Sequence, residues 1–195
     1  MPDSAVRRTR LVFHLIFHTH WDREWYLPRA AFTARLVPVV DWLIDALEQD
    51  EAFRTFLLDG QTVLLEDYLR VRPEQAARVH HLVATGRLAT GPWYVLADEL
   101  IPSGESLIRN LLLGSSASRR LGRRLEVLYS PDAFGHPAVW PQLAAQFGIA
   151  HGVLWRGLAP ALDDGDLFRW AAPDASEVLL YHLPRDGYEI GSALP

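Results

Sequence analysis

Short apolar runs alternate with longer amphipathic stretches along almost the whole chain. The short runs have the length and apolar character of β-strands, and they cover residues 11–17, 56–58, 93–97, 125–129 and 152–155. The stretches between them predict helices over residues 30–50, 63–69, 74–84, 106–121 and 137–147. This alternation predicts an α/β fold with a mainly parallel sheet and helices outside it.

In some places the sequence leaves the local structure open. Pro38 lies inside the first helical stretch, so that helix either kinks there or begins there. The apolar segments 168–170 and 178–181 flank a turn-like Pro173-Asp-Ala-Ser sequence, which predicts either a hairpin or a bent sixth strand. His14 lies within the first apolar run, and we expect it in the core.

The composition excludes several kinds of site. The 195 residues include no cysteine, which excludes disulfides and thiolate metal sites. All 19 basic residues are arginine, which excludes a catalytic lysine. The net charge of −5 gives no indication of a nucleic-acid partner. We expect no membrane span and a cytoplasmic location, because no segment is apolar over a sufficient length and no leader pattern is evident.

Polar side chains follow most of the expected strands. In chain order they are His18, His20 and Asp22, then Asp98 and Glu99, then Asp132 and His136, and finally Arg156. In α/β folds the chemistry lies beyond the carboxyl ends of the strands. We therefore expect these side chains to converge on one rim of the sheet.

The sequence His18-Thr-His20-Trp-Asp22 has the spacing of metal ligands. Residues two apart in an extended segment point the same way, so His20 could hold one ion together with either His18 or Asp22. Imidazole and carboxylate suit zinc, and also manganese or iron. A loop with surface histidines is the alternative, and the added aspartate favours the metal site.

The acidic segments also carry alternatives. Asp132 follows an apolar strand and could serve as a metal ligand, a nucleophile or a general base. It could equally cap the helix near Pro137. Asp98 and Glu99 are locally typical of a solvated loop, whereas His136 could orient a neighbouring ligand.

Longer motifs occur in order along the chain. They are His18-Thr-His-Trp-Asp-Arg-Glu-Trp-Tyr26, Gly91-Pro-Trp-Tyr94, Asp98-Glu-Leu-Ile-Pro-Ser-Gly-Glu-Ser-Leu-Ile-Arg-Asn-Leu-Leu112 and Ser130-Pro-Asp-Ala-Phe-Gly-His136. Together they resemble glycoside hydrolase family 38, the class II α-mannosidases, and especially its bacterial branch that includes mannosylglycerate hydrolases. The resemblance extends from about residue 11 to about residue 190.

The resemblance implies roles for individual residues. The positions that match zinc ligands of the family are His20, Asp22 and Asp132. Asp132 also matches the catalytic nucleophile. The positions that resemble substrate-binding residues are Trp25, Phe134 and Arg156. Candidates for supporting this site from behind are His18, Asp98, Glu99 and His136.

The resemblance also implies a fold and an activity. The fold would be a seven-stranded parallel β/α barrel, incomplete in this chain, with a tail over residues 1–10 and the N-terminal portion of the catalytic domain over residues 11–195. The activity would be zinc-dependent hydrolysis of a terminal α-mannoside with retention, through a covalent intermediate on Asp132. A C-terminal portion or a second chain would supply the acid/base and the fourth zinc ligand.

Two other functions stay open at this point. A truncated chain could keep a carbohydrate or metal site without turnover. A metal-dependent deacetylase-like barrel would use similar histidine and aspartate ligands. Hydrolysis of an aryl α-mannoside would favour the mannosidase, and release of acetate from an acetylated sugar would favour the deacetylase.

Overall fold

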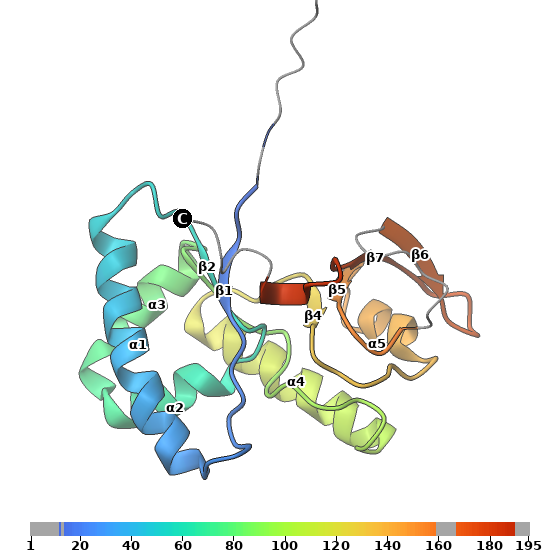
Figure 1. The fold of residues 1–195 in the computed structure, drawn as a ribbon, viewed down its shortest axis with the longest axis horizontal. Helices are drawn as coiled ribbons and strands as arrows, with labels where there is room; N and C mark the ends of the chain where they lie inside the picture. Colours follow the sequence, from blue (N-terminus) through green and yellow to red (C-terminus); the bar gives the residue numbers. More distant parts are fainter. Residues whose placement is uncertain (1–11, 13, 159–166, 190–195) are drawn as a thin grey trace, which may run out of the picture.

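The structure is a computed structural model that describes residues 12, 14–158 and 167–189 (Figure 1). The N-terminal half contains β1 (Phe17–Thr19), α1 (Arg29–Gln49), β2 (Phe56–Leu58), α2 (Val63–Val71), α3 (Ala76–Ala84) and β3 (Leu88–Ala89). The C-terminal half contains α4 (Gly104–Leu121), β4 (Leu128–Ser130), α5 (Trp140–Gln146), β5 (His151–Leu154), β6 (Leu167–Ala171) and β7 (Glu177–His182). Short 3₁₀ turns cover Pro73–Gln75 and Gly187–Glu189. The expected tail, residues 1–10, lies outside the described residues, and the division into a tail and a domain stays a prediction.

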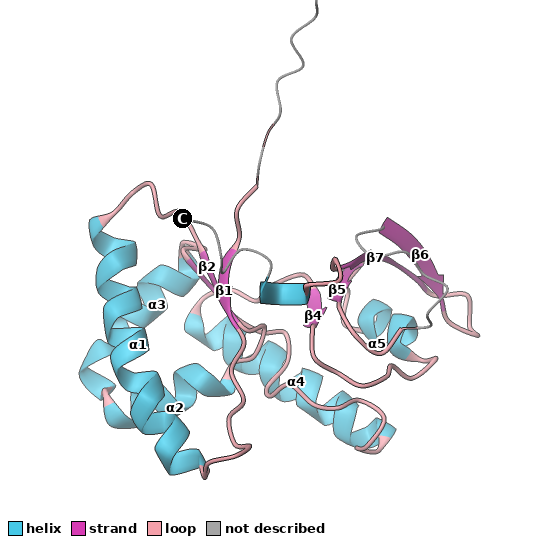
Figure 2. Cartoon of the chain, viewed as in Figure 1, coloured by secondary structure: helices cyan, strands magenta, loops and turns pink. Residues whose placement is uncertain are grey.

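The strands form two mainly parallel sheets (Figure 2). The first has the order β1-β2-β3, and all its pairs are parallel. The second has the order β4-β5-β7-β6, in which β6 alone runs antiparallel and pairs with β7. The α/β class is thereby confirmed, and the segment around Pro173 forms a hairpin rather than a bent strand. Within the described residues the two sheets stay separate, so the seven-stranded barrel is not confirmed.

Each sheet is covered by helices and has its own core (Figure 1). In the N-terminal half, α1 contributes the fully buried side chains of Leu43, Ile44 and Leu47, which pack with apolar residues of α2, α3 and β2. In the C-terminal half, the core gathers around Trp140 and includes residues of α4, β5 and β7. No helix in the described part of the chain is long and apolar enough to cross a membrane. The buried residues of the two cores show that the helices pack against the sheets through their apolar faces, as the 3.6-residue periodicity predicts.

The expected buried strand over residues 11–17 is wrong. The strand begins at Phe17 and ends at Thr19, and His14 is exposed instead of buried. Leu15 and Ile16 are 64% and 65% exposed. β1 lies at the edge of its sheet and pairs with β2 alone among the described strands. Leu11 and Phe13 lie outside the described residues.

The expected strand over residues 93–97 is also wrong, because a helix side chain takes the backbone hydrogen bonds in the middle of this segment. The Asn110 side chain of α4 accepts from the N–H groups of Tyr94 and Val95 at 2.8 Å and 3.1 Å. It also donates to the carbonyl of Val95 at 2.7 Å. Trp93 alone in this segment bridges to a strand-like neighbour, Gln61. Helix α1 agrees better with expectation, although it begins before Pro38 and runs through it.

Candidate active site

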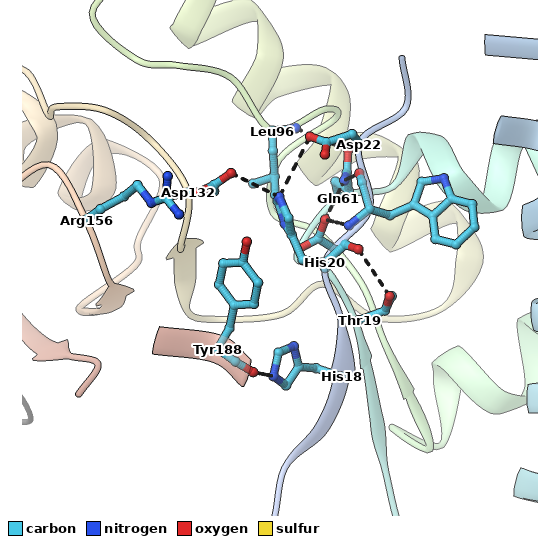
Figure 3. Close-up of polar contacts among 11 residues, drawn as sticks. His18, Thr19, His20, Asp22, Gln61, Leu96, Asp132, Arg156 and Tyr188 are labelled. Atoms are coloured by element: carbon cyan, nitrogen blue, oxygen red, sulfur yellow. Dashed lines mark hydrogen bonds and ion pairs between the residues drawn. The ribbon is translucent and has the colours of Figure 1, made fainter. Parts of the chain in front are cut away.

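The carboxyl ends of neighbouring strands bring polar side chains together, as expected. His20 directly follows β1 and Asp59 directly follows β2, whereas Asp132 and Arg156 lie just beyond β4 and β5. His20 contacts Asp59, and it also faces Asp132, which contacts Arg156. Figure 3 shows Asp132 between His20 and Arg156. The two sheets therefore meet at one cluster of charged groups, which we call the rim site.

Asp59 fixes the orientation of His20. Its Oδ1 lies 3.1 Å from His20 Nδ1, and its side chain is fully buried. Its other oxygen accepts hydrogen bonds from Trp21 N at 2.7 Å and from Gln61 Nε2 at 2.8 Å. In the neutral form of the imidazole, the Asp59 carboxylate favours the proton on Nδ1, which leaves a lone pair on Nε2.

His20 Nε2 is buried and has no hydrogen-bond partner. It lies 3.4 Å from Asp132 Oδ2 and 3.8 Å from Asp22 Oδ1. Two ligand atoms of a tetrahedral zinc ion, each about 2.0–2.2 Å from the metal, lie about 3.3–3.6 Å apart. The donor types suit zinc and the distance to Asp132 lies within this range, whereas the distance to Asp22 exceeds it. No group of three or more His, Asp or Glu among the described residues is arranged to hold an ion as it stands.

The charges of the rim site act on its titratable groups. Burial by itself lowers the pKa of His20, but the hydrogen bond to Asp59 and the carboxylates of Asp59, Asp22 and Asp132 together raise it above 6.5. Burial also raises the pKa of Asp59 against the opposing effect of His20. Tyr188, whose ring centroid lies 4.8 Å from that of His20, has its pKa raised to about 12 by burial and by the charge of Asp132. The Tyr188 phenol therefore remains a hydrogen-bond donor at neutral pH.

Arg156 is the cationic neighbour of Asp132. Its Nε lies 2.8 Å from Asp132 Oδ1, which is a close ion pair without hydrogen-bond alignment. The guanidinium carbon lies 4.2 Å from the ring centroid of Trp155 and 5.1 Å from that of Phe134. The helix-cap interpretation of Asp132 is wrong, because α5 begins at Trp140 without a side-chain cap. Asp132 is free of that role and faces the histidine of the other sheet.

Asp98 and Glu99 contact the loop after β4, which carries both Asp132 and His136. Asp98 Oδ1 accepts from Phe134 N at 3.0 Å. Glu99 Oε2 lies 2.8 Å from His136 Nδ1, and Glu99 is only 2% exposed, so the solvated-loop interpretation is wrong for it. These residues lie where supporting residues were expected, and their roles stay predictions.

The structure does not bring every expected residue to Asp132. His18 Nε2 donates to the carbonyl of Tyr188 at 2.8 Å. Trp25 is 75% exposed and packs edge-on against Tyr26 at a centroid distance of 5.3 Å. The sugar-binding role expected for Trp25 and the supporting role expected for His18 therefore rest on the resemblance.

Sequence reasoning missed Asp59, Gln61 and Tyr188. Asp59 has the same signal as Asp132, a carboxylate just after a short apolar strand. Its position after residues 56–58 could therefore have identified it. Its backbone has φ 51° and is followed by Gly60 at φ 62°, a left-handed turn that aspartate tolerates. Gln61 and Tyr188 carry no comparable local pattern.

A pocket of about 260 Å³ lies beside His20 and Asp22, with walls that include Trp21, Gln61 and Leu96. A larger hollow of about 620 Å³ lies elsewhere, between α4 and Phe147, and arginine side chains line it. The smaller pocket is the one lined by His20 and Asp22, and its walls do not include Asp59, Asp132 or Arg156.

Residues 10–193 match the family described as the N-terminal domain of glycosyl hydrolases family 38. The chain belongs to glycosyl hydrolase family 38. This confirms the resemblance found in the sequence motifs and places the chain in a family of enzymes.

Relatives of this family 38 chain are considerably longer. It is 39% identical over 194 residues to a protein of Halalkalibacterium halodurans provisionally named a mannosylglycerate hydrolase, covering 93% of this chain and 22% of that protein. An α-mannosidase structure from Enterococcus faecalis V583 superposes with a TM-score of 0.85 at 37% identity, over 90% of this chain and 20% of that one. A second family 38 structure from Enterococcus faecalis gives a TM-score of 0.72 at 34% identity, over 85% and 18%. The chain thus spans about a fifth of the length of these relatives.

Proposed function

We propose that this family 38 chain carries the zinc-binding and nucleophilic part of a retaining α-mannosidase. The observation that supports the proposal most strongly is His20 Nε2, a buried nitrogen without a hydrogen-bond partner that faces Asp22 and Asp132. An imidazole lone pair opposite two carboxylates is a donor set that zinc binds. The names of the relatives supply the substrate class, a terminal α-mannoside.

The proposed roles at the metal follow from the contacts. His20, Asp22 and Asp132 would hold the ion, and Asp59 would orient His20 from behind through Nδ1. When bound, zinc supplies a Lewis acid that holds sugar hydroxyl groups. Gln61 and Trp21 N supply hydrogen bonds to Asp59, so the orienting carboxylate is itself fixed.

Asp132 is the proposed nucleophile. One carboxylate oxygen attacks the anomeric carbon while the bond to the leaving oxygen breaks, and a carboxylic acid protonates that oxygen. The resulting base then takes a proton from water, whose oxygen bonds to the same carbon while the bond to Asp132 breaks, and mannose leaves with retained configuration. Arg156 holds a positive charge next to Asp132 Oδ1, and Phe134 flanks its guanidinium group. We propose that Arg156, Phe134 and Trp25 contact the sugar.

We infer that another portion of a longer protein, or a second chain, completes the site. The chain covers only 22% and 20% of its relatives. The completing portion would supply the acid/base, the fourth zinc ligand and the remaining strands of a seven-stranded barrel. A cytoplasmic location stays a prediction.

Zinc content tests the proposal directly. Elemental analysis of the 195-residue chain should find a single zinc ion per chain and markedly less in Asp132→Ala. Glu51→Ala, which removes an exposed carboxylate just after α1, is the matched control and should retain zinc. If neither the parent nor the control binds zinc, the proposed metal site of this chain is wrong.

A non-catalytic carbohydrate- or metal-binding remnant is the second candidate. It is favoured by the lack of a complete group of three metal-binding side chains in the described part of the chain. Hydrolysis of an aryl α-mannoside with added zinc supports the enzyme. Zinc binding without turnover, in this chain and in a longer form, supports the remnant. Release of acetate from an acetylated sugar would instead support the deacetylase-like activity.

A further inference from the structure

A second pair of a histidine and a carboxylate joins Glu99 to His136, which lies on the same loop as Asp132. The side chains of Glu99 and His136 are each only 1% exposed, and Glu99 Oε2 lies 2.8 Å from His136 Nδ1. The other Glu99 oxygen accepts from Trp140 Nε1 at 3.2 Å. Trp140 stacks on Trp170 at a centroid distance of 5.7 Å, and both rings meet the His136 imidazole edge-on. The pair is thus enclosed and well supplied with partners.

The hydrogen-bond partners define where the protons of this pair lie. His136 Nε2 lies 3.0 Å from the carbonyl oxygen of Arg156, and a carbonyl can only accept, so Nε2 carries a proton. Nδ1 and the Glu99 carboxyl group share a further proton, whichever of the two holds it. Every polar atom of both side chains therefore has a partner, and the imidazole is held in one orientation.

The loops after β4 and β5 are locked together at the same place. Arg156 N lies 3.4 Å from the carbonyl oxygen of Pro131, to which it donates. Gly157 has φ 84°, and a Cβ there would lie 2.5 Å from Gly135 N and 2.8 Å from Ala133 O. The two loops thus pack backbone against backbone. With His136 bound to its carbonyl, Arg156 has its main chain fixed on both sides while its side chain reaches Asp132.

We propose that Glu99 and His136 are positioning residues that hold the Arg156 guanidinium against Asp132 by fixing the Arg156 carbonyl. They act through Arg156 and touch neither the reacting atoms nor the substrate. The catalytic meaning of this placement rests on the proposed function, in which Asp132 is the nucleophile. The placement itself is independent of zinc and of turnover, so it can be tested separately.

Two substitutions of His136 separate its two nitrogen atoms. Asn places its amide near the position of Nδ1 and can still reach Glu99, but it loses the donor to the Arg156 carbonyl. Gln places an amide nitrogen near the position of Nε2 and keeps that donor. His80→Asn, at an exposed position of α3, is the matched control.

Nuclear magnetic resonance of the metal-free chain gives the readout. The guanidinium carbon of Arg156 lies 4.2 Å from the Trp155 ring centroid, so ring currents displace the Arg156 side-chain signals upfield. We expect this displacement to be lost in His136→Asn and retained in His136→Gln and in the control. A general effect on the fold would not distinguish the two His136 variants.

Each alternative outcome decides the question. If the displacement persists in a folded His136→Asn, or disappears equally in both variants, His136 does not act through the Arg156 carbonyl and the proposal is wrong. If His136→Asn does not fold, the unmutated chain still provides a test. A slowly exchanging Nε2–H of His136 with a coupling to the Arg156 carbonyl carbon supports the proposal, and an unprotonated Nε2 overturns it. None of these results depends on zinc binding, so a failure of the proposed function is seen separately.

Discussion

The N-terminal and C-terminal halves of the molecule each hold one histidine with a buried carboxylate, His20 with Asp59 and His136 with Glu99. In the N-terminal half, the second ring nitrogen of the histidine has no hydrogen-bond partner and faces Asp132. In the C-terminal half, the second nitrogen donates to the carbonyl of Arg156. The two pairs contain the same chemical groups but differ at this one atom. We call His20 with Asp59 the open pair, and His136 with Glu99 the closed pair.

This difference indicates which histidine can bind a further group. A buried polar atom that lacks a partner costs free energy, and a bound water or ion, stored strain or a catalytic role can account for it. His18 Nδ1 is also without a hydrogen-bond partner, but only His20 Nε2 faces Asp22 and Asp132. A pair whose atoms are all bonded instead makes its surroundings rigid. His20 is therefore the candidate ligand, and His136 supports the loop that presents Asp132. Predictions that separate the two pairs test this assignment.

The largest expected effect on stability comes from removing Trp140, the side chain that encloses the closed pair. Trp140 is 1% exposed, stacks on Trp170 and donates to Glu99. Trp140→Ala should lower the free energy of unfolding by about 3–5 kcal/mol, because it opens a cavity and leaves a Glu99 oxygen unpaired. Urea unfolding followed by circular dichroism measures this. A loss below about 1 kcal/mol would show that this half is loosely packed.

Replacing each histidine should separate the open pair from the closed pair. His20→Ala should weaken zinc binding by more than about 100-fold, because it removes a proposed ligand and not merely a residue behind one. His136→Ala should weaken it far less, since its imidazole bonds to Glu99 and Arg156. Competition with a chromophoric zinc chelator measures both. Equal losses of zinc affinity in the two variants would contradict the assignment of His20, and not His136, as a zinc ligand.

Neutralising each carboxylate should give a smaller and equally selective effect. Asp59→Asn should reduce zinc affinity by about 10- to 100-fold, because the amide makes His20 a weaker base and holds it less firmly. Glu99→Gln is the matched change in the closed pair and should leave zinc affinity nearly unchanged. The same chelator assay applies, with the native fold checked by the near-ultraviolet spectrum. A larger loss of zinc affinity in Glu99→Gln than in Asp59→Asn would show that the closed pair, and not the open pair, supports the metal site.

Local sequence patterns predicted much of the fold but not where distant contacts override them. The strand over residues 56–58 and the start of the helix at Val63 were predicted from apolar periodicity. Residues 93–97 were mispredicted as a strand because the backbone there bonds to the side chain of Asn110, on a helix that comes later in the chain. Apolar character also does not ensure burial, because Leu15 and Ile16 lie before the start of β1 and are exposed.

The candidate site was predictable only in part for the same reason. The position beyond a strand end identified His20, Asp132 and Arg156, and it would have identified Asp59 as well. The pairing of Glu99 with His136 joins residues 37 positions apart, and neither residue lies in a pattern that names the other. Which histidine has an unpartnered nitrogen depends on such contacts. The residue types alone therefore could not separate the open pair from the closed one.

The smallest expected effect concerns surface charges of the N-terminal half. Arg78 of α3 donates to Glu48 of α1 and also pairs with Asp45 at 2.7 Å. The hydrogen bond from Arg78 lowers the pKa of Glu48 below 4.5. Ionised Glu48 therefore stabilises the fold above its ordinary pKa, and this contribution is lost as the pH falls through the lowered value. The pair is partly exposed, so solvent and salt screen it.

Glu48→Gln should accordingly lower the free energy of unfolding at neutral pH by less than about 1 kcal/mol. Urea unfolding at several pH values and salt concentrations should show the difference from the parent shrinking in acid and in high salt. In the C-terminal half Arg124 is 5% exposed, pairs with Glu126 and donates to the carbonyl of Phe147 at 3.0 Å. Arg124→Met should cost more and respond less to salt, because a buried charge is poorly screened. If Glu48→Gln proved the costlier and less salt-sensitive change, the N-terminal helices would depend on their surface charges and not on the apolar core beneath them.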